Sequence, residues 1–249
     1  MISCVILTHN SQDSIVEALK SVSWCDERIV IDDESSDQTV VIAKRYKAQV
    51  FPHSLNNDFA AQRNYGLSLA KGEWVLFLDS DEMVTPELQK DIQDECKKIK
   101  TADAYYIPRI DRMFGKNLRF GDTGGARFIR LAKKQAGKWE REVHETWDIA
   151  GEVKTFTHPL LHSPHPNIKL FLSQINRYTT INARVFYGQG KRATCCAILV
   201  YPIAKFLYIY IVQLGFLDGI AGFIMAMMMS FHSFLTRAKL WQLQKVTAK

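Results

Sequence analysis

Residues 74–81 read WVLFLDSD, a run of apolar and aromatic side chains that ends in two aspartates separated by one serine. A short, continuous apolar run of this kind is typical of a strand buried on both faces of a sheet. Residues i and i+2 of an extended chain point to the same side. The stretch therefore predicts a buried strand whose end presents Asp79 and Asp81 together at the rim of a sheet.

Two earlier apolar runs also end in polar side chains. Residues 2–7 lead into Thr-His-Asn at 8–10, and residues 28–31 lead into the aspartate pair at 32–33. Segments with helical spacing of apolar residues lie between the runs, over 15–22, 40–46 and 59–70. Alternating strands and helices predict an α/β fold with a doubly wound, mainly parallel sheet. Ligands bind such sheets beyond the carboxyl ends of the strands, so the three polar clusters should converge on one rim.

Charge is distributed unevenly along the chain. Up to Glu152 the sequence holds 21 Lys and Arg against 25 Asp and Glu, whereas from Val153 onward it holds 11 basic residues and one acid, Asp218. A basic and apolar C-terminal region suits an anionic membrane surface better than it suits nucleic acid. The five cysteines lack zinc-binding spacing, and residues 1–7 lack the features of a signal peptide, so we expect free thiols and a catalytic part in the cytosol.

Asp79 and Asp81 are candidate metal ligands. Mg²⁺ or Mn²⁺ is typically held by one or two carboxylates together with substrate phosphates, and two carboxylates at one strand end can face a single cation. Prolines near His158, His162 and His165 argue against a helical zinc arrangement of these three histidines. His162 is the first candidate to complete the metal site or to contact the diphosphate, and a loop histidine with a satisfied hydrogen bond is the favoured alternative. A solvated turn with a helix cap is the alternative interpretation of the two aspartates.

Asp32 and Asp33 form the second acidic cluster at a predicted strand end. A carboxylate in this place can accept a hydrogen bond from a base N–H or from a ribose hydroxyl. The sequence contains no GxGxxG motif, which argues against a dinucleotide, and no GxxxxGK[ST] motif, which excludes a P-loop.

Taken together, these segments resemble family-2 glycosyltransferases of the GT-A fold. The resemblance rests on VILTHN at 5–10, IDDESSD at 31–37, RNYG at 63–66 and FLDSDE at 77–82, which follow the family's order within the first 100 residues. It implies a UDP-sugar donor and inversion at the anomeric carbon. The implied contacts are Thr8 and Asp32 or Asp33 with the uridine, and Asp79 and Asp81 with the metal and diphosphate; Asn10 and Arg63 lie in the matching segments and are further candidates for the nucleotide sugar. Glu34 stands where the family usually has glycine.

The second half of the chain is similar to the bacterial lipopolysaccharide or lipooligosaccharide core glucosyltransferase branch. This resemblance rests on REVHE at 141–145, GFLDG at 215–219 and the closing apolar segment 234–241. It implies that glucose is added to an inner-core heptose. We expect a lipid-linked saccharide as the acceptor and a location at the cytoplasmic face of the bacterial inner membrane. We expect a catalytic domain over 1–187, with a nucleotide-binding half at 1–100 and an acceptor half at 101–187, followed by a membrane-associating helical region over 188–249.

An inverting transfer needs a general base for the acceptor hydroxyl, and a nearby carboxylate would serve. Glu140, Glu142 and Glu145 are the candidates, and their spacing alone does not choose between them. The resemblance favours His144 and Glu145, with Glu145 as the base; a solvated charged loop is the alternative. Farther upstream, Arg127 or Arg130 could hold a phosphate oxygen through a charge-assisted fork.

The apolar segments 195–214 and 216–235 are each about long enough to cross a bilayer. Lys205 interrupts the first and Asp218 the second, and a charge at the bilayer centre costs about 2.5–3.5 kcal/mol. We therefore expect interfacial or re-entrant helices, and so a peripheral or monotopic protein, over true spans. A helical pair buried in a dimer is the alternative.

Two other functions are weighed against the transferase. A nucleotidyltransferase usually needs a glycine-rich, basic phosphate loop near the N-terminus, and residues 8–12 offer none. A non-catalytic membrane adaptor that kept the fold would not need Asp79, Asp81 and the candidate bases, all of which are present. No nucleic acid partner is expected.

Overall fold

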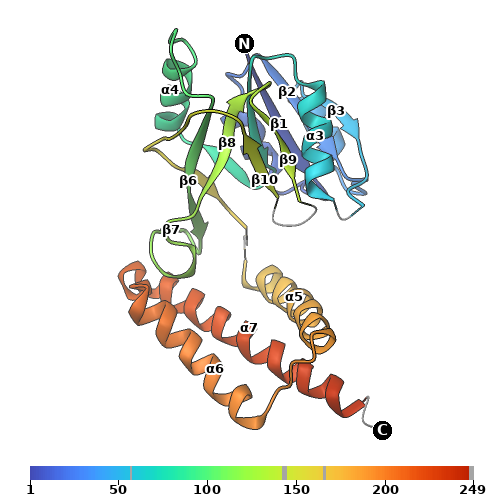
Figure 1. Cartoon of the computed structure of the whole chain (residues 1–249), viewed down its shortest axis with the longest axis vertical. Helices are drawn as coiled ribbons and strands as arrows, with labels where there is room; N and C mark the ends of the chain where they lie inside the picture. Colours follow the sequence, from blue (N-terminus) through green and yellow to red (C-terminus); the bar gives the residue numbers. More distant parts are fainter. Residues whose placement is uncertain (57, 142–144, 165–166, 247–249) are drawn as a thin grey trace. The chain divides into compact units, whose positions relative to one another are not determined.

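The computed structural model describes residues 1–56, 58–141, 145–164 and 167–246. The chain divides into two compact units, drawn in Figure 1: residues 1–110 with 126–163, and residues 111–125 with 164–249. The first unit contains the sheet and the second is helical. The longer segment of the second unit begins at Pro164, whereas the sequence led us to expect a division at 187/188. The helix that starts at Ile168 belongs to this unit because it packs with the last helix of the chain.

The N-terminal half of the sheet is parallel, as predicted. Its strands are β1 (Ile2–Thr8), β2 (Glu27–Asp32), β3 (Gln49–Pro52) and β4 (Trp74–Asp79), in the spatial order β3-β2-β1-β4. Alternate residues of β1 enter opposite layers: Cys4 and Ile6 join one buried cluster, and Val5 and Leu7 join the other. Burial on both faces explains why these strands are continuous apolar runs in the sequence.

The second half of the sheet is mainly antiparallel. Its central strands, β8 (Arg127–Lys133) and β6 (Ala104–Met113), extend the order as β4-β8-β6, and β8 runs antiparallel to both neighbours. The smaller strands of this sheet are β5 (Glu82–Val84), β7 (Lys116–Leu118), β11 (Val153–Thr155) and β12 (Leu160–His162), and β11 is parallel to β6. Strands β9 (Gly137–Glu140) and β10 (Thr146–Ile149) form a separate two-stranded antiparallel sheet. The α/β class is confirmed, while the parallel arrangement holds for β1 to β4 and the sheet as a whole is mixed.

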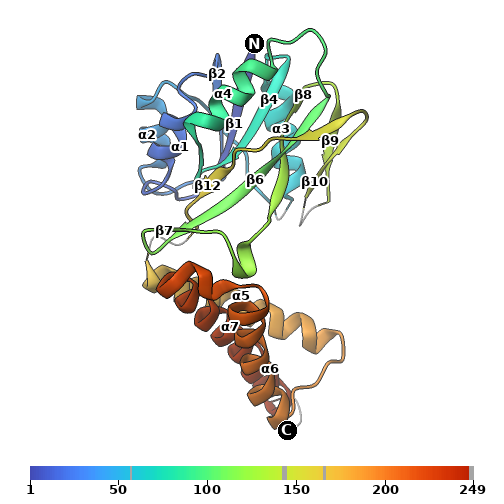
Figure 2. The ribbon, with the colours of Figure 1, turned by 90° about the vertical axis from the view of Figure 1, so that its left-hand side faces the viewer.

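Helices cover both faces of the sheet, as Figures 1 and 2 show. Helices α1 (Ile15–Ser21), α2 (Thr39–Arg45) and α4 (Pro86–Glu95) bury their apolar residues in one layer. Helix α3 (Phe59–Leu69) and the β9–β10 hairpin form the other layer. Gly66 lets α3 approach the sheet closely, because a Cβ at this position would lie 2.5 Å from Val5 Cγ1.

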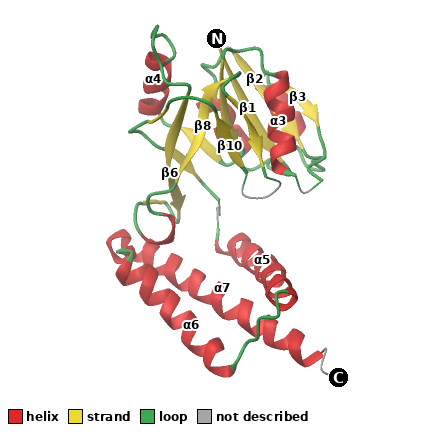
Figure 3. Cartoon of the chain, viewed as in Figure 1, coloured by secondary structure: helices red, strands yellow, loops and turns green. Residues whose placement is uncertain are grey.

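The second unit is a helical bundle, coloured red in Figure 3. It contains η1 (Gly121–Thr123), α5 (Ile168–Gly188), α6 (Cys195–Leu207), the π-helical turn η2 (Tyr208–Val212), η3 (Gly215–Asp218) and α7 (Gly219–Val246). Phe171 and Ile175 of α5 pack with Met225 of α7 and with Met113 and Leu118 from the strands that enter this unit. The expected apolar helical extension is therefore present, and α5 is part of the same bundle.

Candidate functional site

Three strand ends meet at one rim of the sheet. Thr8 at the end of β1 lies opposite Asp32 at the end of β2, and Leu7 lies opposite Asp79 at the end of β4. The polar clusters that follow three separate apolar runs are therefore neighbours in space. This arrangement places the candidate nucleotide-binding and metal-binding residues at the carboxyl edge of the parallel strands, where ligands of such sheets bind.

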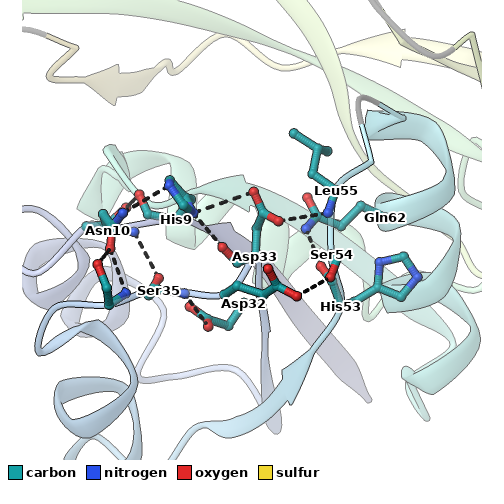
Figure 4. Close-up of polar contacts among 12 residues, drawn as sticks. His9, Asn10, Asp32, Asp33, Ser35, His53, Ser54, Leu55 and Gln62 are labelled. Atoms are coloured by element: carbon teal, nitrogen blue, oxygen red, sulfur yellow. Dashed lines mark hydrogen bonds and ion pairs between the residues drawn. The ribbon is translucent and has the colours of Figure 1, made fainter.

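The loops after β1 and β2 are tied together by side chains (Figure 4). Asn10 accepts hydrogen bonds through Oδ1 from the Ser36 N–H at 2.8 Å and from the Ser36 hydroxyl at 3.2 Å, while the Asn10 N–H donates to Ser35 Oγ. His9 Nδ1 lies 2.5 Å from the carbonyl oxygen of Asp33. Asn10 thus connects the loops that follow β1 and β2, and its side-chain oxygen already accepts hydrogen bonds from Ser36.

Two buried oxygens at this rim have no hydrogen-bond partner among the described residues: Thr8 Oγ1 and Asp32 Oδ1. Thr8 is 5% exposed and Asp32 is 4% exposed. The other oxygen of Asp32, Oδ2, accepts from the Ser35 N–H at 3.0 Å. A buried polar atom without a partner is costly, and this cost is offset when a ligand completes the hydrogen bond.

The loop after β2 keeps its sharp turn without glycine. Glu34, which stands where the resembling family usually has Gly, adopts a left-handed φ of 51°. Its carboxylate accepts a hydrogen bond from the Ser54 hydroxyl at 2.6 Å, and the neighbouring Asp33 carboxylate accepts from the Leu55 N–H at 2.8 Å. These contacts to the loop after β3 support a conformation that a non-glycine residue rarely adopts.

Asp79 is held between two guanidinium groups. Arg63 from α3 donates to Asp79 Oδ1 at 2.9 Å, and Arg130 from β8 donates to Asp79 Oδ2 at 2.5 Å. Burial alone would raise the pKa of the Asp79 carboxyl, but the charges of Arg130 and Arg63 outweigh burial and hold this pKa well below 3.8. Both carboxylate oxygens therefore already have cationic partners.

A buried charge network continues behind Asp79. Arg130 also donates to Glu82 Oε1 at 2.8 Å, and Arg109 NH1 lies 3.7 Å from the same oxygen. The Glu82 side chain is fully buried, and its Oε2 accepts from the Asp79 N–H at 3.0 Å. Arg127, the other arginine candidate of β8, is exposed and lies over the ring of Tyr106. The arginine of β8 that reaches the Asp-Ser-Asp segment is thus Arg130.

Glu145 joins the site through Arg63. The Glu145 Oε1 atom accepts from Arg63 Nε at 3.0 Å and lies 2.9 Å from Arg63 NH2, so one guanidinium bridges Glu145 and Asp79. Arg63 is only 3% exposed and lies over the ring of Trp139, with 4.7 Å between its Cζ and the ring centroid. The catalytic candidates Glu142 and His144 lie outside the described residues.

Asp81 and His162 form the remaining pair at the rim. His162 Nε2 lies 3.4 Å from Asp81 Oδ2, and strand β12 carries His162 beside β5. A carboxylate and an imidazole at this separation are ligands that a divalent cation can accept together. Within the described part of the chain no group of three or more His, Cys, Asp or Glu side chains could hold a metal ion. A cation at this rim would therefore depend on ligands from substrate phosphates in addition to Asp81 and His162.

Arg130→Met should lower the free energy of unfolding by about 3–5 kcal/mol at pH 7. The substitution leaves the carboxylates of Asp79 and Glu82 without the cation that they share. Urea and thermal unfolding measure the loss. Arg127→Met, at an exposed position of the same strand, is the matched control and should change the stability by less than about 0.5 kcal/mol.

The effect of Arg130→Met should depend on pH with a defined sign. In the wild-type chain the pKa of Asp79 is depressed, so its ion pairs stabilise the fold above pH 3.8, and this stabilisation is lost as the pH falls through the lower pKa of the folded state. Without Arg130 that depression is weaker. The stability difference between wild type and variant should therefore be largest near neutral pH and shrink below about pH 4; a constant difference would contradict the role given to this ion pair.

Comparison with known proteins identifies the family of the chain. The model of glycosyl transferase family 2 matches residues 3–149, more than half of the chain. An uncharacterized glycosyltransferase of Rickettsia bellii is 28% identical over 263 residues, covering 97% of this chain and 86% of the relative. The lipopolysaccharide core biosynthesis glycosyltransferase LpsC of Rhizobium meliloti is 23% identical and is matched over 100% of this chain and 94% of its own length.

Among solved structures, a fragment of TarS from S. aureus in complex with UDP-GlcNAc is similar, with a TM-score of 0.47 and 16% identity over 97% of this chain and 88% of that chain. The region matched by the family model contains Thr8, Asp32, Asp79 and Glu145, and His162 lies beyond it. The resemblance seen in the sequence motifs is thus confirmed, and the chain belongs to glycosyl transferase family 2.

Proposed function

We propose that the chain is an inverting glycosyltransferase that moves a hexose, glucose by our prediction, from a UDP-sugar to a lipid-linked saccharide such as the inner core of lipopolysaccharide. Family membership supports the transferase chemistry, and the name of LpsC supports the acceptor class. The observation that carries the proposal is the pair of buried, unpartnered oxygens of Thr8 and Asp32 at a rim that also holds the Asp-Ser-Asp segment.

The nucleotide would bind over the ends of β1 and β2. The Asp32 Oδ1 atom can accept a hydrogen bond from the N–H of a uracil base, and the Thr8 hydroxyl can donate to one of its carbonyl oxygens. Asp33 is partly exposed and accepts a hydrogen bond from the Leu55 N–H, and we assign its carboxylate to a ribose hydroxyl. Arg63 NH1 is buried without a partner in the described chain, so it retains a donor for a diphosphate oxygen.

Asp32→Asn should weaken the binding of UDP by about 10- to 100-fold. The substitution removes the negative charge from a hydrogen-bond acceptor, and hydrogen bonds to charged groups contribute about 1.5–3 kcal/mol. Isothermal titration calorimetry with UDP measures the change. Asp13→Asn, at an exposed acid in the same unit, is the control and should bind UDP normally. Unchanged affinity in the Asp32 variant would remove this residue from the nucleotide site.

The described side chains fit a divalent cation of the Mg²⁺ or Mn²⁺ type. Asp81 and His162 would hold it, while Asp79 stays bound to Arg63 and Arg130 and acts on the site through them. When bound, such a cation neutralises charge on the departing diphosphate. The guanidinium group of Arg63 lies at the same rim, and its positive charge would stabilise the negative charge that develops on UDP as it leaves.

Glu145 is the proposed general base. Both contacts with Arg63 fall on Oε1, so this oxygen is fixed and Oε2 is the atom that takes the proton from the acceptor hydroxyl. The acceptor oxygen then forms a bond to the anomeric carbon on the face opposite the bond to the diphosphate, which breaks with its electron pair going to UDP. A single displacement of this kind inverts the configuration of the sugar.

A donor screen tests the proposal as a whole. The purified chain is incubated with Mn²⁺, individual UDP-sugars and membranes from a strain deleted for the gene, and both UDP release and the mass of the glycolipid are measured. We expect UDP-glucose to support release and to add one hexose. No release with any sugar nucleotide would favour a non-catalytic adaptor, and pyrophosphate release from UTP with a sugar phosphate would favour a nucleotidyltransferase.

The two compact units would divide this work. We propose that the sheet unit carries the chemistry and that the helical unit, which contains the whole of the predicted region 188–249, brings it to the cytoplasmic face of the membrane. Two segments of the helical unit, Cys195–Val212 and Gly215–Val246, are long and apolar enough to cross a membrane by length and composition.

A further inference from the structure

The outer surface of the helical unit is unusually apolar. Of the 30 large hydrophobic side chains that are exposed in the described chain, 24 lie between Ile168 and Val246. On α6, Val200, Ile203 and Leu207 are 60%, 61% and 45% exposed and lie on one face at helical spacing. Only 6% of the segment Cys195–Val212 is buried inside the protein. A patch of this extent needs a partner.

The net positive charge of the helical unit indicates which kind of partner covers this apolar surface. Residues 111–125 and 164–249 contain 13 Lys and Arg but only three acids, Asp111, Asp122 and Asp218. Asp111 and Asp218 are buried, and Asp122 is paired with Lys205 at 2.8 Å. The exposed charge is therefore positive, which attracts anionic lipid headgroups and makes two copies of this surface repel each other.

The turn between α6 and α7 is hydrogen-bonded to residues 116–121 of the same unit. Asp218 Oδ2 accepts hydrogen bonds from the Arg119 and Phe120 N–H groups at 3.0 and 2.9 Å, and Lys116 Nζ donates to the Asp218 carbonyl. The Gly121 N–H donates to the Gln213 carbonyl at 2.9 Å. Asp218 belongs to the GFLDG segment noted in the sequence. Its hydrogen bonds to Lys116, Arg119 and Phe120 link the α6–α7 turn to the connection between β6 and β8, and we call this set of contacts the clamp.

This clamp restricts how the helices can meet a bilayer. The connection 114–126 leaves the sheet at β6 and returns at β8, so covalent continuity keeps it on the side of the membrane that holds the sheet. If α6 and α7 crossed the bilayer, their far ends would lie on the opposite side, and α5, which joins the sheet unit to α6, would have to cross as well.

Helix α5 is too polar to cross a bilayer. It carries Arg177 and Arg184 as exposed charges in its middle and C-terminal half, and a charged side chain in the bilayer core is expensive. Lys239 of α7 donates to the Asn176 and Thr180 side chains of α5, which places a further charge at the contact of the two helices.

We infer that the helical unit binds one leaflet of an anionic bilayer as a monotopic platform, with the α6–α7 turn, the α5–α6 linker and the end of α7 all on the cytoplasmic side. The inference deepens the membrane contact of the proposed function and rests on it. Neither experiment below needs a sugar donor or acceptor, so their failure and the failure of the transfer reaction are distinguishable.

The first experiment maps topology with a membrane-impermeant maleimide–polyethylene glycol. Three versions with one accessible cysteine each report three places: Asn117→Cys beside the clamp, native Cys195 at the start of α6, and Lys245→Cys near the end of α7. In each version the half-buried Cys96 and the other exposed thiols are changed to Ser, and the buried Cys4 and Cys25 are kept. In inverted inner-membrane vesicles, which expose the cytoplasmic face, all three should react as fully as they do after detergent. Reaction of N117C alone, with Cys195 and K245C protected until detergent is added, would overturn the inference.

The second experiment measures flotation with vesicles of phosphatidylglycerol and phosphatidylcholine. The double variant V200D/I203D should lose binding, and each of Arg177→Gln and Arg184→Gln should lower the partition coefficient about fivefold. Val41→Asp, which changes an exposed apolar residue of the sheet unit, should bind normally. Equal binding to vesicles without anionic lipid, or a stable wild-type dimer that V200D/I203D dissociates, would show that a membrane of this kind is not the partner.

Discussion

Glu145→Gln should lower the rate of sugar transfer by about 10²- to 10⁴-fold, the usual contribution of a positioned general base. The amide has the shape of the carboxylate and can still accept the hydrogen bonds of Arg63 through its oxygen, but it cannot take the proton of the acceptor hydroxyl. UDP release in the presence of acceptor measures the rate. The binding of UDP and the unfolding temperature should remain close to those of the wild type, because the amide oxygen keeps the hydrogen bonds of Arg63 and the uridine contacts lie at the ends of β1 and β2.

Glu140→Gln is the matched control for this prediction. Glu140 is exposed at the end of β9 and lies 3.5 Å from Lys138, so its loss should leave turnover unchanged. Glu142→Gln and His144→Ala complete the set, since these two candidates lie outside the described residues. A Glu145→Gln variant with normal turnover, accompanied by an inactive Glu142→Gln variant, would transfer the role of base to Glu142.

The sequence was sufficient to predict the parallel half of the fold. Each of β1, β2 and β4 is buried on both faces, so the apolar runs are continuous and their polar ends are sharp. The second half of the sheet is harder to predict, because short strands such as β11, which is parallel to β6, and β12, which is antiparallel to β5, carry little periodicity and their partners are set by tertiary pairing. The packing of α5 with α7 likewise depends on contacts between segments that are far apart in the chain.

The sequence predicted which strand ends form the candidate site. It did not predict which side chains contact one another there. Arg127 and Arg130 are three residues apart on β8, and the pairing of β8 with β6 is irregular at Arg130, so the sequence alone does not show which of the two arginines reaches Asp79. The bridge from Arg63 to Glu145 spans 82 positions and cannot be read from local spacing. Glu34 shows the converse case, in which a departure from the family's glycine is accommodated by a left-handed backbone and a contact with Ser54.

The contacts of Asp79 and Asp81 indicate that the two aspartates of the Asp-Ser-Asp segment have different roles. Asp79 is occupied by two buried arginines, whereas the carboxylate of Asp81 faces only His162 among the contacts described above and is partly exposed. Removing Asp79 should therefore destabilise the fold as well as the reaction, because it leaves Arg63 and Arg130 without their shared partner. Removing Asp81 should affect the reaction alone.

Asp81→Ala is accordingly expected to lower turnover with Mn²⁺ by about 10³-fold or more, the scale of several kcal/mol that a cation contributes to departure of a charged leaving group. Its unfolding temperature should stay within a few degrees of the wild type, since no buried partner is lost. His162→Ala, which removes the other donor, should give a loss of about 10- to 100-fold. Calorimetry separates a metal role from a structural one: Mn²⁺ should tighten UDP binding to the wild type and not to the Asp81 variant. If Asp81→Ala turns over normally, or if Mn²⁺ still tightens its binding of UDP, the cation is held elsewhere and the division of labour between Asp79 and Asp81 is wrong.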